Sequence, residues 1–229
     1  MKQGEIIPIT KERLIEIVSS QKFMSAIKRS KGMYNHEKAF RVCHRVYGPR
    51  HMVSKVIAGT CDSVDCSPLR EQAKRILGDN SYLLIDVHYH NATLMPSGFY
   101  MNEGGDLQTQ SVNRKLTREL YRIDTRPIQC IGRSTKEDDI TFLFVQEKTP
   151  CILTDKQQNE VNEVVEGHYQ FLHDEYAAAE ELEMTGLYKA KVITINTCFG
   201  PFTSDLEKFA YFAFNPQKIE NIEERLQRL

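Results

Sequence analysis

The chain has 229 residues, of which 41% are hydrophobic and 27% charged, and its formal net charge at pH 7 is −1. This balance is typical of a globular protein with a real core, and it argues against a basic nucleic-acid-binding protein and against an acidic disordered one. No apolar run has the length of a signal peptide or of a membrane span. We therefore expect a cytoplasmic protein with no nucleic-acid partner and no membrane partner.

The first part of the chain predicts a helix, a β-hairpin and a second helix. The expected bounds are 10–29 for the first helix, 39–47 and 52–58 for the two strands, and 67–77 for the second helix. Thr10 can cap the first helix, and apolar residues follow it at helical spacing. The Gly48-Pro49 turn separates the two strands, and Pro68 falls in the first turn of the second helix.

The most apolar strand of the N-terminal half is SYLLIDVHYH, residues 81–90, which we expect to be central in a sheet. A loop over 91–105 follows and contains three glycines. Asp106 then stands where an N-cap would open a helix to about residue 123. Two further strands are expected, at 127–131 and 140–145.

Past Pro150 the sequence becomes more acidic. The expected elements are a long helix or helix pair over 155–184, strands over 191–197 and 209–214, and a last helix from residue 216. Any break in the long helix is expected at Gly167. Because the elements before residue 150 already complete an α/β order, we predict an α/β domain over 1–150, with a mixed sheet flanked by helices. Residues 151–229 would be an appended helix–strand element that is separable or binds a partner.

The cysteines are scattered and form no CxxC pair. They are Cys43, Cys61, Cys66, Cys130, Cys151 and Cys198. In a cytosolic chain such cysteines indicate reduced thiols rather than a disulfide framework. The closest pair, Cys61 and Cys66, lies in a Ser/Asp-rich loop with no further ligands at zinc-knuckle spacing, so we expect a structural or incidental role for it.

The strongest local signal for chemistry is His88-Tyr89-His90, at the end of the apolar strand. Residues i and i+2 of a strand point to the same side, so the two imidazoles project together and can share one metal ion. Catalytic zinc takes about three protein ligands, and Asp106 at the mouth of the next helix is well placed as the third. The alternative is that two half-exposed histidines end a strand and bind water. Asp86 either orients a ligand imidazole or is an ordinary hydrogen-bonded partner.

In their order along the chain, these residues resemble the motif of the JAMM (MPN-type) metallopeptidases, over roughly residues 8–148. Glu37 leads into a strand after the first helix, and the His-x-His pair begins 51 residues later, followed by Ser97 and Asp106. Three features depart from the family pattern, the first being that six residues rather than seven separate His90 from Ser97. Asn91 stands where a proline is usual, and eight residues separate Ser97 from Asp106 where the family has a shorter spacing.

The resemblance implies a cytidine-deaminase-like sandwich that binds Zn²⁺. The implied zinc ligands are His88, His90 and Asp106. Glu103 is a rival for the third position, Glu37 would be the general base, and the Ser97 hydroxyl would stabilise an oxyanion. The implied activity is that of a zinc-dependent peptidase or isopeptidase acting on a protein or peptide substrate, including ubiquitin-like modifiers.

Two other functions stay open on the sequence. A non-catalytic MPN-type module can use the same fold as a scaffold, and the expanded loop would then mark loss of the site. Another class of metal-dependent hydrolase could have acquired the His-x-His pair independently. The loop over 91–105, with an apolar tip at 99–101, is expected to be a mobile gate over the metal. An oligomer is also compatible with the sequence.

Overall fold

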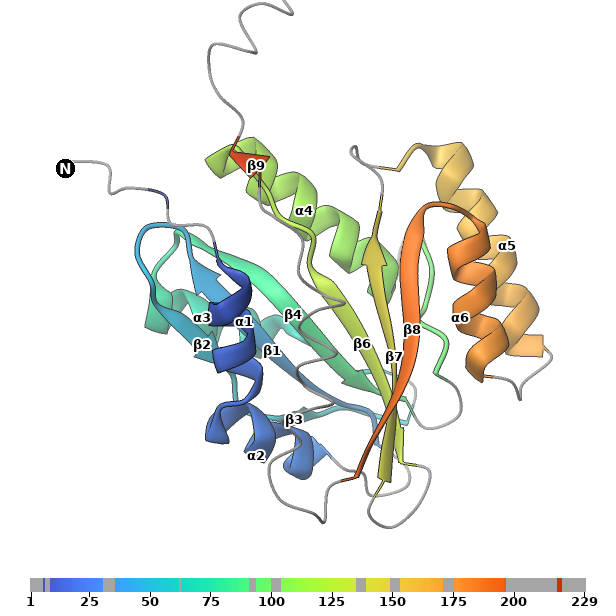
Figure 1. Cartoon of the computed structure of the whole chain (residues 1–229), viewed down its shortest axis with the longest axis horizontal. Coiled ribbons are helices and arrows are strands. Elements are labelled where there is room, and N and C mark those ends of the chain that lie inside the picture. Colours follow the sequence, from blue (N-terminus) through green and yellow to red (C-terminus); the bar gives the residue numbers. More distant parts are fainter. Residues whose placement is uncertain are drawn as a thin grey trace, which may run out of the picture.

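A mixed sheet crosses the molecule and carries helices on both of its faces (Figure 1). The computed structural model describes residues 6, 9–30, 36–61, 63–90, 94–99, 104–134, 139–148, 153–170, 175–196 and 218–219. Within these ranges the helices are α1 (Lys11–Val18), α2 (Gln21–Ser30), α3 (Ser67–Leu77), α4 (Asp106–Tyr121), α5 (Asp155–Gln170) and α6 (Glu175–Met184). The strands are β1 (Lys38–Arg45), β2 (His51–Val53), β3 (Ile57–Ala58), β4 (Ser81–Tyr89), β5 (Ile123–Asp124), β6 (Ile128–Ser134), β7 (Asp139–Glu147), β8 (Tyr188–Asn196) and β9 (Lys218–Ile219).

The main sheet has seven strands in the order β2-β1-β4-β6-β7-β8, with β3 also paired to β1. Strands β4 and β6 run parallel, whereas the other neighbouring strands run antiparallel. A parallel pair needs a crossover connection, and α4 lies within the connection from β4 to β6. The prediction of an α/β fold with a mixed sheet flanked by helices is confirmed.

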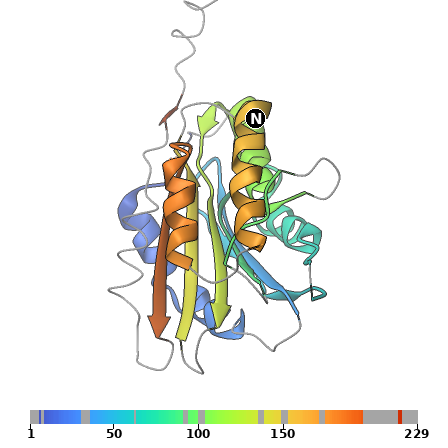
Figure 2. The ribbon, with the colours of Figure 1, turned by 90° about the vertical axis from the view of Figure 1, so that its right-hand side faces the viewer.

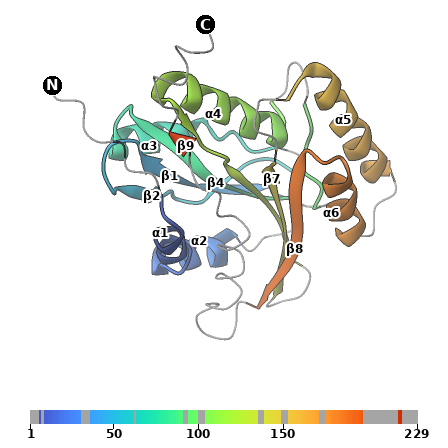
Figure 3. The same ribbon diagram turned by 45° about the horizontal axis from the view of Figure 1, so that its top comes forward.

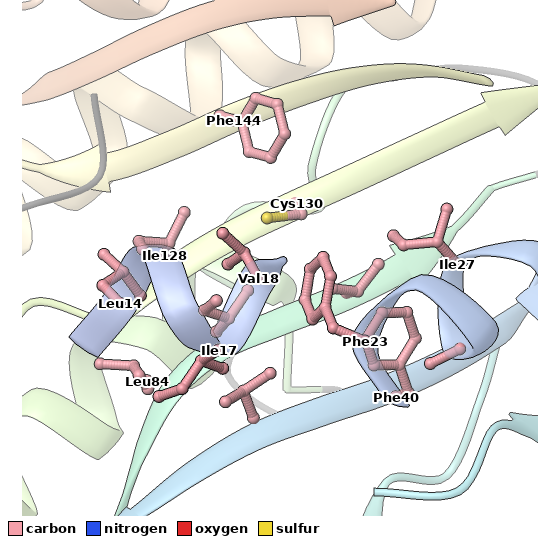
Figure 4. Close-up of a cluster of buried hydrophobic side chains, with 14 of the residues drawn as sticks. Leu14, Ile17, Val18, Phe23, Ile27, Phe40, Leu84, Ile128, Cys130 and Phe144 are labelled. Atoms are coloured by element: carbon pink, nitrogen blue, oxygen red, sulfur yellow. The ribbon is translucent and has the colours of Figure 1, made fainter. Parts of the chain in front are cut away.

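Helices α1 and α2 cover one face of the sheet (Figure 3). Their apolar side chains pack onto β1, β4, β6 and β7, and the rings of Phe23 and Phe40 meet edge to face with centroids 5.6 Å apart. The side chains labelled in Figure 4 are Leu14, Ile17, Val18, Phe23, Ile27, Phe40, Leu84, Ile128, Cys130 and Phe144. The single helix expected over 10–29 is two helices, because the Ser20 hydroxyl accepts a hydrogen bond from the Phe23 N–H at 3.3 Å and starts a new helix.

The opposite face carries α3, α4, α5 and α6. Helix α6 lies over β8 and β7, and α5 lies beside α6 (Figure 2). The fully buried side chains of this second core include Leu107, Ile131, Leu143, Val145, Val161, Val165, Leu182 and Tyr188. Helix α3 packs separately, through Ala73 and Leu77, on Cys43 and Leu83. The end of β4 therefore lies between the helix α3 and the start of α4, and its polar residues face that space.

Strand β8 extends the main sheet instead of belonging to an appended element. It pairs with β7 along its whole length, from Asp139 opposite Asn196 to Glu147 opposite Tyr188. The helices before it bury Val161 and Leu182 completely against the same sheet. Residues 153–170 and 175–196 therefore complete the core of the α/β unit, which differs from the expected boundary near residue 150.

Other predicted elements agree in part. The helix expected over 67–77 is α3 with the same bounds, and the long acidic helix is a pair in which Gly167 lies inside α5. The expected strand over 209–214 lies outside the described residues. Lys218–Ile219, expected to be helical, form β9 and pair antiparallel with β5.

In the part of the chain that the structure describes, no helix combines the length and the apolar character needed to cross a membrane.

Candidate metal centre

Polar residues at the end of β4 point to the face of the sheet that carries α3 and α4. Strand alternation places Asp86, His88 and His90 on this side, while Val87 and Tyr89 pack in the core under α1 and α2. The neighbouring strand β1 puts Arg41 opposite Asp86 and Ala39 opposite His88. The His88 and His90 imidazoles therefore lie on the same side of the sheet, as expected.

The start of α4 brings a carboxylate against both imidazoles. Asp106 is the first residue of α4 and is buried. Its Oδ1 lies 2.6 Å from His88 Nδ1, and its Oδ2 lies 3.4 Å from His90 Nε2. One donor atom from each of these three residues falls within 4.8 Å of the other two. The three ligands predicted from the sequence thus form a group that could hold a metal ion.

Ser97 forms hydrogen bonds to the Asp106 carboxylate. Its hydroxyl donates to Asp106 Oδ2 at 2.9 Å and accepts from the Asp106 backbone N–H at 2.8 Å. The backbone N–H of Ser97 donates to the same Oδ2 at 2.9 Å. Ser97 therefore fixes the orientation of Asp106 and satisfies one of the free N–H groups at the start of α4.

The two ends of the expanded spacing, at Ser97 and Asp106, lie close together. The Leu107 N–H donates to the Ser97 carbonyl at 3.0 Å. A Cβ on Gly105 would lie 1.8 Å from the carbonyl oxygen of Gly98, so only glycine allows this close approach. Despite the expanded spacing, the serine and the aspartate are therefore in contact.

The described parts of the loop over 91–105 are packed against the domain. Leu94 and Met95 are buried in the core beneath α5. The backbone of Phe99 exchanges two hydrogen bonds with the Asn162 side chain, of 2.7 and 2.8 Å. Of the apolar tip expected at 99–101, only Phe99 is described; Tyr100 and Met101 lie outside the described residues, as does the rival ligand Glu103.

The centre holds more carboxylates than permanent cations. Burial alone would raise the pKa of Asp86, but the Arg41 guanidinium and the His88 imidazole hold it well below its usual range. Burial likewise opposes ionisation of Asp106, and His88 and His90 again hold its pKa well below the usual range. Burial disfavours protonation of His88, yet the two flanking carboxylates raise its pKa well above the ordinary value. The site therefore favours positive charge, which a proton on His88 or a divalent cation can supply.

Two residues of the centre were missed from the sequence. Cys66, just before α3, places its Sγ 3.3 Å from His88 Nε2, and Gln129 of β6 places its Nε2 3.4 Å from both His88 Nδ1 and Asp106 Oδ1. Cys66 and Gln129 do not belong to a sequence motif with the His-x-His pair, because each lies in a different part of the fold. Only the parallel pairing of β4 with β6, which sets Gln129 beside Asp86, could have pointed to the glutamine.

The metal centre lies at one end of a groove between α3 and α4. The groove has a volume of about 1150 Å³, and both Glu37 and His90 line it. Glu37 precedes Lys38, the residue paired with Tyr89, so alternation places Glu37 on the face of the two histidines. Along α4 the groove is bordered by Val112, Leu116 and Leu120, which are partly exposed apolar side chains.

No protein-family model matches this chain, and a search of curated proteins finds no match. The chemistry of the centre therefore rests on its own geometry. Imidazole and carboxylate donors suit zinc and other divalent first-row metals.

Proposed function

We propose that this chain is a zinc-dependent peptidase or isopeptidase of the JAMM (MPN) type. The observation that carries the proposal is the meeting of His88, His90 and Asp106 at the start of α4. Glu37 immediately precedes β1, the strand next to β4, and it lines the same groove. The order of strand, histidine strand and helix also agrees with the order that the resemblance implies.

The donor group fits zinc. In a tetrahedral site with ligands at about 2.0–2.2 Å, two nitrogen or oxygen ligands lie about 3.3–3.6 Å apart. The distance from His90 Nε2 to Asp106 Oδ2 is 3.4 Å. The 2.6 Å contact between His88 Nδ1 and Asp106 Oδ1 is a hydrogen bond, so a cation bound between them would take the place of the His88 proton.

A zinc ion bound here would supply a Lewis acid and a water whose pKa is lowered to about 7. Glu37 would accept the proton of the attacking water and return it to the leaving amine, since Glu37 lines the same groove as the histidines. Ser97 would act through Asp106, because its hydroxyl is already bonded to that carboxylate. This positioning role replaces the oxyanion contact that the resemblance implies for Ser97.

The groove supports a chain-like substrate. It runs from the metal centre along α4, where Val112, Leu116 and Leu120 recur at i, i+4 and i+8 and are 46%, 40% and 67% exposed. Such a row can contact the side chains of an extended peptide or of the tail of a protein modifier. A protein or peptide substrate is therefore the substrate class that we propose.

A non-catalytic module is the second candidate. The observation that favours it is the commitment of the Ser97 hydroxyl to Asp106, which leaves no described hydroxyl from the motif directed at a substrate carbonyl. Peptidase activity separates the two candidates, and the type of bond that is cleaved separates a peptidase from another metal-dependent hydrolase.

The test uses zinc-loaded protein with a peptide library, isopeptide-linked ubiquitin dimers and a simple ester. Cleavage of a peptide or isopeptide bond is expected in the wild type, with turnover abolished in Glu37→Gln while zinc stays bound. Glu71→Gln is the matched control, because Glu71 is an exposed carboxylate of α3 that lines the same groove. Wild-type turnover in Glu37→Gln, or hydrolysis of the ester alone, would contradict the proposal.

A further inference from the structure

A second group of donor atoms lies on the other edge of the His88 ring. Cys66 Sγ and Asp86 Oδ1 each lie 3.3 Å from His88 Nε2. One donor atom from each of these three residues falls within 4.8 Å of the other two. This group shares only His88 with the centre formed with His90 and Asp106, and it faces the start of α3 instead of the start of α4.

The carboxylate of Asp86 is only half satisfied. Its side chain is fully buried, and Arg41 donates to Oδ2 through Nε at 3.0 Å and Nη2 at 2.7 Å. The other oxygen, Oδ1, accepts no hydrogen bond within the described residues and is directed at His88 Nε2. A buried carboxylate oxygen without a donor is costly, and a cation between it and the imidazole would satisfy it.

The hydrogen bond between His88 Nδ1 and Asp106 leaves His88 Nε2 as the nitrogen that can bind a metal ion. Asp106 Oδ1 lies 2.6 Å from His88 Nδ1, so Nδ1 is the nitrogen that donates its proton to a carboxylate. In the neutral ring Nε2 then carries the lone pair, and Nε2 is the atom that faces Cys66 and Asp86. A ligand histidine in metalloproteins commonly donates its second N–H to a carboxylate in this manner.

The distances agree with those between ligands of one metal ion. In a tetrahedral zinc site an oxygen and a nitrogen ligand lie about 3.3–3.5 Å apart, and a thiolate sulfur and a nitrogen about 3.6 Å apart. The corresponding distances here are both 3.3 Å, for Asp86 Oδ1 and for Cys66 Sγ. Both donors can therefore reach one ion bound to His88 Nε2 with little movement.

We propose that Cys66, Asp86 and His88 Nε2 form a second position for a thiolate-tolerant divalent metal such as zinc or cobalt. A neutral imidazole offers one lone pair, so this position and the one with His90 and Asp106 compete for His88. An ion in the thiolate position is bound away from His90 and is not in the place proposed for catalysis. The inference goes beyond the peptidase proposal, since it requires only that the chain binds a metal.

Cobalt(II) titration of the metal-free protein tests the second position, because a thiolate bound to cobalt gives a charge-transfer absorption in the near ultraviolet. The wild type is expected to show this absorption, and Cys66→Ser to lose it. The Ser variant should still fold, because residue 66 is the N-cap of α3 and serine is a preferred N-cap residue. The exposed Cys61 supplies the matched control, and Cys61→Ser should keep the absorption.

The His90→Ala variant distinguishes two separate metal positions from a single ion that both Cys66 and His90 bind. The thiolate absorption should persist in this variant, because His90 belongs only to the other donor group. Absorption that is absent from the cobalt-bound wild type, or that survives Cys66→Ser, would overturn the proposal. Loss of the absorption in His90→Ala would overturn it as well, since Cys66 would then be one more ligand of a single ion. Failure to cleave peptides would refute the proposed peptidase function and leave these spectra unchanged.

Discussion

Replacing Ser97 by alanine should destabilise the start of α4 and loosen the metal centre. The change removes one hydrogen bond from Oγ to the Asp106 carboxylate and one from the Asp106 backbone N–H to Oγ. A bond to a charged group contributes about 1.5–3 kcal/mol, and loss of a side-chain cap costs about 0.5–2 kcal/mol. In the alanine variant Asp106 Oδ2 still accepts the hydrogen bond from the Ser97 backbone N–H at 2.9 Å and still lies near the His90 imidazole. The lower ends of these two energy ranges therefore apply. We expect a loss of about 2 kcal/mol in the free energy of unfolding.

Urea unfolding of the metal-free protein measures this loss without a contribution from bound metal. Metal affinity should fall in parallel by about 10–100-fold, as is typical when a group that orients a ligand is removed. Ser97→Thr is the matched control, because it keeps the hydroxyl, and it should recover most of both losses. An unfolding free energy within about 0.5 kcal/mol of wild type in Ser97→Ala would show that the hydroxyl does not hold Asp106. The oxyanion role implied by the family resemblance would then be the better assignment.

Two further predictions concern how the centre is supported. Arg114, which is buried in α4, donates hydrogen bonds to Glu147 at 2.6 Å and to Asp124 at 2.7 and 3.0 Å. Arg114→Ala removes the cationic partner of the buried Glu147 carboxylate, so the free energy of unfolding measured in urea should fall by about 3–5 kcal/mol. A fall below about 1 kcal/mol would contradict this prediction. A chain ending at residue 149 should be unfolded or insoluble, because β7 would lose its pairing with β8 and the second core would lose α5 and α6. A cooperative thermal transition of this shortened chain, measured by circular dichroism, would refute that expectation.

Local signals predicted much of the fold. The helix over 67–77 was predicted with the bounds it has, and Pro68 in its first turn gave the signal for its start. The break at Ser19-Ser20 was not predicted, since the apolar stripe continues across it and periodicity does not register a capping serine.

Long-range pairing is what the sequence could not supply. The appended part predicted after residue 150 joins the main sheet, because β8 pairs with β7 from a position distant along the chain. Helix α5 contains few apolar residues, yet its Val161 and Val165 are fully buried, as is Leu182 of α6. A small apolar set on a charged helix can still complete a core when a sheet lies beneath it.

The candidate centre shows the same division. Strand alternation predicts that His88 and His90 project together, and the glycine-rich approach to α4 indicated Asp106. Cys66 and Gln129 reach His88 from a loop and from a neighbouring strand, with no spacing that links them to the His-x-His pair. Their proximity depends on the packing of α3 and on the register of β6, which no local pattern encodes.

Metal content in the wild type and in His88→Ala tests the central claim most directly, because His88 belongs to both donor groups of the centre. Elemental analysis of the purified wild-type protein should give about one equivalent of zinc or another divalent metal per chain. The His88→Ala variant should be folded by circular dichroism and contain essentially no metal. A wild type without metal after incubation with zinc, or stoichiometric metal in the folded His88→Ala variant, would contradict the account.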